Sequence, residues 1–210
     1  QSADRLSMRQ ARGDAMRAVD PQRVQFDFLV GNEEPGSFDA EIRDRGGQIH
    51  VCAGHQRVQS YSKQVLKALH GAVPYDCVHS HVHHFSGLVL GLAAQAGVRN
   101  RIAHSHNDTR SSPKNRALAR RMYRRVMMSV IRHYMTLGIG VSIPAMEDLF
   151  GSNWQSSEHL RLLYCGIDLL PFQSISNRAA ILRELGLPPD ALVVGHVANF
   201  SPAKNHSLVV

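Results

Sequence analysis

The sequence predicts an α/β protein built on a doubly wound, mostly parallel, Rossmann-like sheet, followed by the start of a second domain. Two observations lead to this prediction. Short apolar segments with the period of a strand alternate with longer segments with the period of a helix, and glycines mark the turns between them. The composition, 43% hydrophobic and 20% charged over 210 residues, fits a globular chain that buries a sizeable core.

The first elements show the pattern in its simplest form. In residues 23–30, Val24, Phe26, Phe28 and Val30 fall on one face at a period of two, which predicts a strand. A helix is expected over residues 37–45, closed by a glycine pair that tolerates the left-handed conformation of a helix end. Further strands are expected at residues 48–52, 75–80, 99–105, 137–142 and 160–164, and further helices at residues 57–71, 85–97, 113–135 and 144–151.

The helix over residues 113–135 is basic. Its apolar residues Leu118, Met122, Val126, Val130 and Tyr134 are spaced by four, which predicts one buried stripe. Positive residues dominate the segment from residue 110 to 134, which has eight arginines and lysines and no acidic residue, against a net charge of +7 for the chain. This favours an anionic partner: a membrane surface, a phosphorylated substrate or nucleic acid.

A domain boundary is expected after residue 168. Residues 1–168 form the first domain, whose first strand is expected to be missing because nothing before Val24 has a strand pattern. Residues 169–210 form a linker and the beginning of the second domain, with a helix over residues 177–186 that has Asn177 as its N-cap and a strand over residues 191–200. Both ends of the chain are expected to be cut.

The cellular setting follows from what the chain contains. The longest apolar run is too short for the roughly 18 to 20 residues of a membrane-spanning helix, so any membrane contact is expected to be peripheral. The three cysteines form no CxxC pair, which favours the reducing cytoplasm. A nucleic-acid partner is not expected, because no known nucleic-acid module accompanies the basic helix.

Histidines gather after two of the predicted strands. His79 and His81 follow or end the strand at residues 75–80, and His104 and His106 lie at the end of the strand at residues 99–105. Ligand sites of parallel sheets form outside the carboxyl ends of strands, so one of each pair is expected to share a crevice.

One interpretation of the histidines that follow the strand at residues 75–80 is a zinc site. His79, His81 and His84 have the HxHxxH spacing of metallo-β-lactamase-type hydrolases, but His83 stands where that family has an aspartate. A zinc-dependent hydrolase is therefore one alternative function. A non-catalytic fragment that binds a membrane or a protein partner through the arginine helix is another.

Four segments in order resemble glycosyltransferase family 4, in the branch that builds exopolysaccharides. They are "VQFDFLVGNEEPGSFDAEIRDRGGQIH", "YDCVHSHVHHFSGLVLGLAAQAGVRNRIAHSHN", "LYCGIDLLPF" and "VVGHVANFSPAKNH". The resemblance implies a GT-B fold of two Rossmann-like domains, with residues 1–168 on the acceptor side and residues 169–210 beginning the nucleotide-sugar side. It implies a retaining transfer of a hexose from a nucleotide sugar to a glycan or lipid-linked acceptor, without a metal or other cofactor.

The same resemblance implies roles for particular residues. His106 matches the histidine that approaches the transferred sugar, and Lys204 matches the lysine that holds the donor diphosphate, beside Asn199, where the family has an arginine. His81, Asn107 and Arg110 are expected to line the acceptor cleft. For the helix from Arg116 to Arg132 two interpretations stay open: it rests on the inner face of an anionic membrane, or its arginines form a solvated face that keeps the protein soluble. The chain as given is expected to be inactive on its own.

Overall fold

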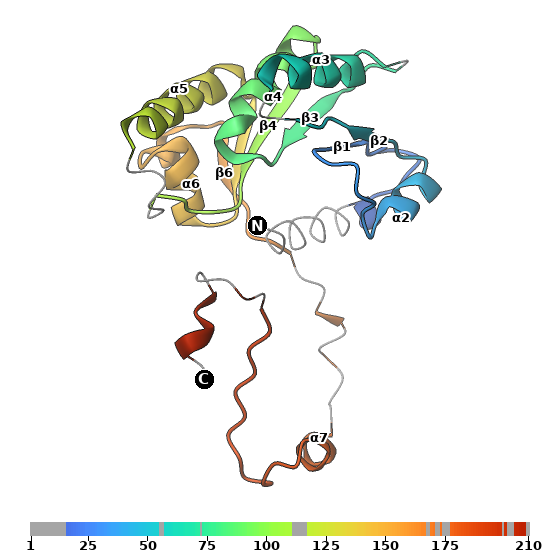
Figure 1. Ribbon diagram of the computed structural model, residues 1–210, viewed down its shortest axis with the longest axis vertical. Coiled ribbons are helices and arrows are strands. Elements are labelled where there is room, and N and C mark those ends of the chain that lie inside the picture. Colours follow the sequence, from blue (N-terminus) through green and yellow to red (C-terminus); the bar gives the residue numbers. More distant parts are fainter. Residues whose placement is uncertain are drawn as a thin grey trace. The chain divides into compact units, whose positions relative to one another are not determined.

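The computed structural model describes residues 16–54, 57–71, 73–110, 117–166, 169–170, 173, 177–198, 200 and 204–208. Strands and helices alternate along the first part of the chain (Figure 1). Contacts divide the chain into two compact units, Gly13–Cys165 and a second that includes Gly166–Val210. The predicted boundary after residue 168 stays a prediction.

All strand pairs in the described residues are parallel. One sheet has the order β3 (Cys77–Ser80), β4 (Asn100–Ser105), β5 (Leu137–Gly140) and β6 (Leu160–Leu162), and a second sheet pairs β1 (Phe28–Val30) with β2 (Ile49–Val51). Helices form the crossovers that parallel neighbours need. The helices of this unit are α2 (Asp39–Asp44), α3 (Val58–Leu69), α4 (Ser86–Gln95), α5 (Leu118–Tyr134) and α6 (Ile143–Phe150), with short 3₁₀ turns η1 (His83–Phe85) and η3 (Trp154–Ser156). The predicted parallel, Rossmann-like α/β fold is confirmed.

The core lies between the larger sheet and its helices. α4 is apolar on nearly every side because it packs against β3 and β4 as well as α3 and α5. A methyl group on Gly87 would lie 3.2 Å from the carbonyl oxygen of Met127, so α4 and α5 approach closely at a residue without a side chain. One buried cluster joins residues of α4, β4, α5, α6 and β6: Leu90, Ala103, Ile131, Met146, Leu149, Phe150 and Leu160.

The first strand is shorter than its alternating pattern predicts. Only Phe28–Val30 pair with β2, and Val24 is 44% exposed. The backbone N–H groups of Arg23 and Val24 both donate to the carbonyl of Asp20, which forms a turn. Because these donors are used in the turn, the expected strand over residues 23–30 is wrong for its first half.

The predicted buried stripe of α5 is wrong for its first three members, whereas Val130 and Tyr134 are half-buried as predicted. A spacing of four residues overshoots a helical turn by about 40° each time, so such a row drifts around the helix. Its first members are exposed, with Leu118 at 71%, Met122 at 51% and Val126 at 50%. The inward face has a mixed spacing of four and three: Tyr123, Met127, Ile131 and Tyr134, of which Ile131 is fully buried. Residues 113–116 of the predicted helix lie outside the described residues.

The second unit contains α7 (Arg178–Glu184), which begins as predicted. The side-chain oxygen of Asn177 accepts a hydrogen bond from the backbone N–H of Ala180 at 3.2 Å, which makes Asn177 the N-cap. Residues 191–198 form no strand, contrary to the prediction, and Leu192 and Val197 are almost completely exposed. A strand exists only through hydrogen bonds to a neighbour, and the described residues of this unit supply none.

Two further expectations concern the membrane and the cysteines. None of the helices in the described segments combines the length and the apolar character needed to cross a bilayer. Cys52 is buried and Cys77 and Cys165 are exposed, and all three are free.

Candidate functional site

The parallel register of β3 and β4 brings two rows of histidines together. His79 pairs with Ile102 and Ser80 with Ala103, so the residues that follow continue side by side. Successive side chains of a strand point to opposite faces. The face with Ser80, Ala103 and Ser105 is buried, and the histidines at positions 79, 81, 104 and 106 lie on the other face.

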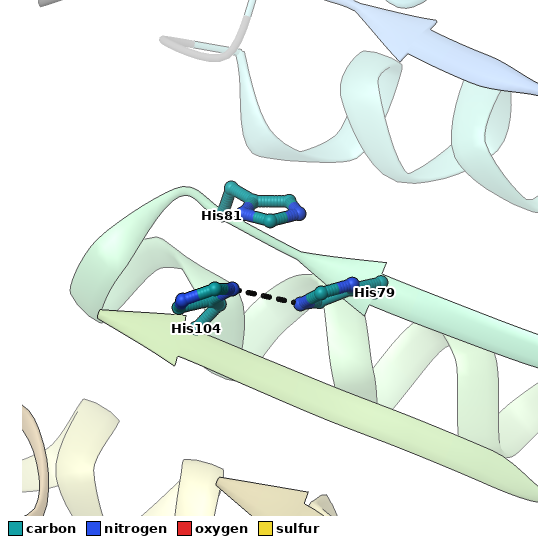
Figure 2. A group of neighbouring side chains, drawn as sticks. All are labelled: His79, His81 and His104. Carbon is teal, nitrogen blue, oxygen red and sulfur yellow. Dashed lines mark hydrogen bonds between the residues drawn. The ribbon is translucent and has the colours of Figure 1, made fainter. Parts of the chain in front are cut away.

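The four imidazoles form a compact stack. Nε2 of His79 lies 3.0 Å from Nδ1 of His104, and Nδ1 of His81 lies 2.8 Å from Nε2 of His106. The ring centroids of His79 and His81 are 4.1 Å apart, and those of His104 and His106 are 4.2 Å apart. Figure 2 shows three of the rings gathered at the ends of the two strands. Thus both predicted cleft histidines, His81 and His106, are in direct contact.

The HxHxxH set is not assembled as a zinc site. Ligand nitrogens from His79, His81 and His104 lie within 4.8 Å of one another, and His84 is not part of this group. His84 instead lies in η1, 4% exposed, with its Nδ1 2.6 Å from Nδ1 of His83. The turn after β3 directs His84 into the core, which the spacing in the sequence does not reveal.

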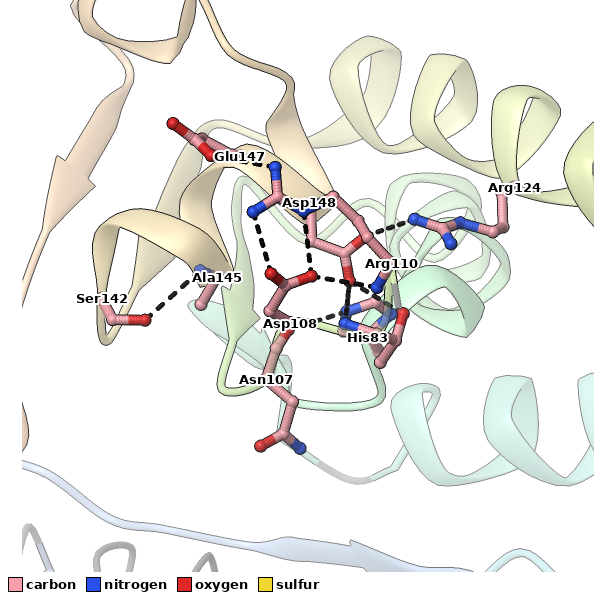
Figure 3. Close-up of polar contacts among 10 residues, drawn as sticks. His83, Asn107, Asp108, Arg110, Arg124, Ser142, Ala145, Glu147 and Asp148 are labelled. Carbon is pink, nitrogen blue, oxygen red and sulfur yellow. Dashed lines mark hydrogen bonds and ion pairs between the residues drawn. The ribbon is translucent and has the colours of Figure 1, made fainter. Parts of the chain in front are cut away.

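A buried carboxylate anchors the loop that follows His106. Asp148, 2% exposed on α6, accepts hydrogen bonds from the backbone N–H of Thr109 at 2.7 Å and from the Thr109 hydroxyl at 2.8 Å. Arg124 of α5 makes an ion pair with the other oxygen of Asp148, and Nε2 of His83 lies 3.2 Å from Asp148 (Figure 3). One side chain therefore ties together α5, α6, η1 and the loop after β4.

His83 has an unusual backbone that fits this role. Its φ of 54° lies in the left-handed region, which histidine enters more easily than most residues. Nε2 of His83 faces two acceptors, Asp148 and the carbonyl oxygen of Asn107 at 3.3 Å, so this nitrogen carries the proton and donates. Nδ1 of His83 lies 2.6 Å from Nδ1 of His84, so one of these two nitrogens donates to the other.

Burial acts in opposite ways on the two titratable groups of this cluster. Burial alone would raise the pKa of Asp148, but hydrogen bonds from His83 and Thr109 hold it well below its usual range. Burial, followed by the neighbouring His83 and Arg124, lowers the pKa of His84 to about 3. At neutral pH the cluster therefore combines an ionised Asp148 with a neutral His84.

The neutral His84 makes the fold sensitive to acid. The pKa of His84 in the folded protein lies below the value of about 6.5 for a histidine in the unfolded chain. Between these two pKa values the unfolded chain binds a proton that the folded protein does not, so the free energy of unfolding falls as the pH falls. From pH 7 to pH 5 we expect a loss of about 2 kcal/mol in the free energy of unfolding from this residue. Urea unfolding of His84→Gln at both pH values should lack this loss, and exposed His159→Gln should keep it. An equal pH dependence in wild type and His84→Gln would contradict the assignment.

The structure places Asn107 and Arg110 at the exposed surface of the same loop. Figure 3 shows the Asn107 side chain directed away from Asp148. Arg110 is held by two acidic residues, Asp108 at 2.8 Å and Glu147 at 2.9 Å. Hydrogen bonds from Arg110 lower the pKa of Asp108. Arg110 thus has a fixed position beside α5, and its predicted role at the acceptor stays a prediction.

A basic hollow lies between this loop and α5. It has a volume of about 310 Å³ and is lined by Arg110, Arg121, Arg124, Arg125 and Met128. Arg110 and Arg124 are paired with carboxylates, and no such pair is found for Arg121 and Arg125 in the described residues. The hollow is therefore suited to an anion.

The predicted donor-side residues belong to the second unit. Lys204 is exposed and precedes the short turn η6 (His206–Leu208). Asn199 lies outside the described residues. Their expected contacts with a donor diphosphate stay predictions.

Sequence reasoning missed the group formed by Asp148, His83, Thr109 and Arg124. A signal was present in α6, where Ala145, Met146, Leu149 and Phe150 form the buried face and Asp148 falls within it. An acidic residue on the apolar face of a helix needs a buried partner.

Comparison with known proteins points to glycosyltransferases. No family model matches the chain. EpsF of Bacillus subtilis (strain 168), which is named as a glycosyltransferase, is 30% identical over 201 residues, which are 92% of this chain and 51% of EpsF. CapH of Staphylococcus aureus, a capsular polysaccharide biosynthesis glycosyltransferase, is 28% identical over 162 residues, which are 75% of this chain and 44% of CapH. This chain is thus similar to bacterial glycosyltransferases and spans about half the length of these relatives.

A similar fold is found in Anabaena HepE (Alr3699). Its crystal structure in complex with UDP-glucose superposes with a TM-score of 0.61 at 20% identity, covering 86% of this chain and 47% of HepE. The HepE complex with UDP gives the same TM-score at 18% identity, covering 88% of this chain and 56% of HepE. At this identity the likeness concerns the fold alone.

Proposed function

We propose that this chain is the acceptor-side part of a retaining, GT-B glycosyltransferase of family 4. The enzyme would transfer a hexose from a nucleotide sugar to a glycan or lipid-linked acceptor in the biosynthesis of a surface polysaccharide, in the cytoplasm. The observation that carries the proposal is the 30% identity to the glycosyltransferase EpsF over 92% of the chain. CapH belongs to capsular polysaccharide biosynthesis, which supports a surface polysaccharide as the product. HepE binds UDP-glucose, which supports a nucleotide sugar as the donor.

His106 is proposed to contact the transferred sugar. An imidazole that donates or accepts a hydrogen bond with a sugar hydroxyl can stabilise charge that develops as the glycosidic bond breaks. His81, whose Nδ1 lies 2.8 Å from Nε2 of His106, would fix the orientation of that ring. Lys204 and Asn199 would contact the donor diphosphate, and Asn107 and Arg110 the acceptor. The transfer is proposed to need no metal.

The proposed reaction is tested by incubating the enzyme that contains this chain with radioactively labelled nucleotide sugars. Radioactive UDP-glucose, UDP-galactose and GDP-mannose are each incubated with a lipid extract of polysaccharide-producing cells. Label is expected to enter the lipid fraction from one donor, in a linkage with the anomeric configuration of that donor. Absence of label in the lipid fraction and absence of free UDP or GDP with all three donors would overturn the proposal.

The exposed side of α5 is proposed to rest on an anionic membrane. Leu118, Met122 and Val126 are exposed on one side of the helix, next to Arg121 and Arg125. An apolar strip beside a row of cations is typical of helices that lie in a membrane interface. This arrangement would hold the enzyme near a lipid-linked acceptor.

Liposome sedimentation tests the membrane contact. Replacing Arg121 and Arg125 with alanine should weaken binding to vesicles with anionic phospholipid about tenfold or more, since each arginine contributes about 1 kcal/mol at such a surface. Lys63→Ala with Lys67→Ala, an exposed pair of the same spacing on α3, is the matched control and should have little effect. Wild-type binding should also fall as salt is raised. Equal binding to neutral vesicles would count against the electrostatic contact.

A further inference from the structure

We propose that His79, His81 and His104 form a binding site for one divalent transition-metal ion of the zinc type. The three imidazoles come from the adjoining ends of β3 and β4, on the face opposite the buried serines (Figure 2). This ion has no part in the glycosyl transfer proposed above, which is proposed to need no metal. The inference stands on the geometry of the cluster and does not depend on that function.

The positions of the ligand atoms fit an ion. One ring nitrogen from each of His79, His81 and His104 lies within 4.8 Å of the other two. A zinc ion binds imidazole nitrogen at about 2.0–2.1 Å, so two nitrogens on one tetrahedral zinc are about 3.3 Å apart. Nε2 of His79 and Nδ1 of His104 are already 3.0 Å apart. The His81 ring stacks beside this pair, with its centroid 4.1 Å from that of His79, and a rotation of its side chain would turn a nitrogen toward the same centre.

In the absence of an ion, hydrogen bonds join these rings in pairs. A bond between two neutral imidazoles needs one donor and one acceptor, and the contacts of His79 with His104 and of His81 with His106 satisfy that description. An ion would instead bind the unprotonated nitrogens of several neutral imidazoles at once.

The backbone supports the cluster in a way that suits a metal site. His79 and His81 occupy positions i and i+2 of one strand segment, which places both side chains on one face, and the paired strand β4 supplies His104 beside them. His106 contacts His81 at 2.8 Å and stacks on His104 at 4.2 Å between ring centroids. Contacts of this kind orient the rings of metal ligands.

The donor set selects the class of ion. It contains imidazole nitrogens alone, which suit zinc, copper, nickel and cobalt, whereas calcium and magnesium prefer oxygen ligands. Three protein ligands also leave a coordination position for water or an anion. His79 is exposed, so an ion can reach the site from solvent.

The test measures zinc binding to the 210-residue chain, produced without a polyhistidine tag and freed of metal with a chelator. Titration calorimetry with zinc chloride should show one ion per chain at micromolar affinity. His79→Gln and His104→Gln, on different strands, should each weaken binding at least 100-fold, and His106→Gln about tenfold. Far-UV circular dichroism and metal-free unfolding show whether each variant is folded. Cys77→Ser and His159→Gln, which change possible ligands outside the cluster, should bind zinc as the wild type does.

A second measurement covers the case in which both ligand variants fail to fold. Wild-type protein loaded with cobalt(II) should show the visible bands of a nitrogen-coordinated ion and no thiolate-to-cobalt charge-transfer band. No saturable binding of one zinc per chain would overturn the proposal. So would binding that survives His104→Gln in a folded protein, or a thiolate band that disappears in Cys77→Ser.

Discussion

Replacing Asp148 with alanine is expected to lower the free energy of unfolding by about 3 kcal/mol, because it leaves the half-buried Arg124 guanidinium and the donors of Thr109 without their partner. The carboxylate is fully buried, and both Arg124 and Thr109 donate to it. Removing it strands those donors in a site with little access to water. Urea or guanidinium unfolding followed by far-UV circular dichroism measures the loss.

The neighbouring residue provides a matched control. Glu147 lies on the same helix and makes an ion pair with Arg110, but both side chains are accessible to solvent. Exposed pairs contribute about 0–1 kcal/mol, so Glu147→Ala should change stability little. Asp148→Asn should fall between the two, because the amide oxygen still accepts from Thr109 while the charge opposite Arg124 is lost. Equal losses for Asp148→Ala and Glu147→Ala would show that burial of the carboxylate is not what stabilises this region.

The low pKa of Asp148 adds a second acid-sensitive range. Its folded pKa is depressed, so its contribution is fully present above the unfolded value of about 3.9 and is lost as the pH falls below it. His84 begins to act earlier in the acid titration. It destabilises the fold as soon as the pH falls below about 6.5, the pKa of an unfolded histidine. Acid unfolding of the wild type should therefore begin with a loss that His84→Gln removes and continue with one that Asp148→Asn removes.

The sequence was informative where one element determines the outcome. Alternating apolar periods predicted the parallel strands and their crossovers, and the ends of β3 and β4 carry the histidines that the structure brings together. Asn177 was identified as an N-cap because that role depends on the side chain and backbone of one turn.

The sequence was less informative where a side chain's position depends on contacts with segments far away along the chain. The partners of Asp148 come from η1, α5 and the loop after β4, and no local pattern links them. The inward face of α5 depends on how α4 packs against it at Gly87, so a regular spacing of four gave the wrong stripe. Likewise, the left-handed φ of His83 turns His84 into the core, which separates it from the histidines with which its spacing groups it.

His106→Ala is expected to reduce the turnover of the proposed glycosyltransferase about 100- to 1,000-fold, the effect of removing one oriented hydrogen-bonding group at a centre where charge develops. In the folded protein His106 contacts His81 and stacks on His104, so its removal takes away a half-buried ring without opening the core. Stability should therefore change by about 1 kcal/mol or less.

A structural role and a role at the sugar predict different results for a set of variants. If His106 contacts the sugar in the transition state, kcat should fall with KM for the donor nearly unchanged, and His106→Asn should recover part of kcat by restoring a hydrogen bond. His81→Ala should lower kcat less, because it acts on the sugar only by orienting His106. Exposed His159→Ala, in the same unit, should leave kcat unchanged and serves as the control. If kcat instead followed the fraction of folded protein across these variants, His106 would be a structural residue, and the group that contacts the sugar would have to be sought elsewhere along the strand ends.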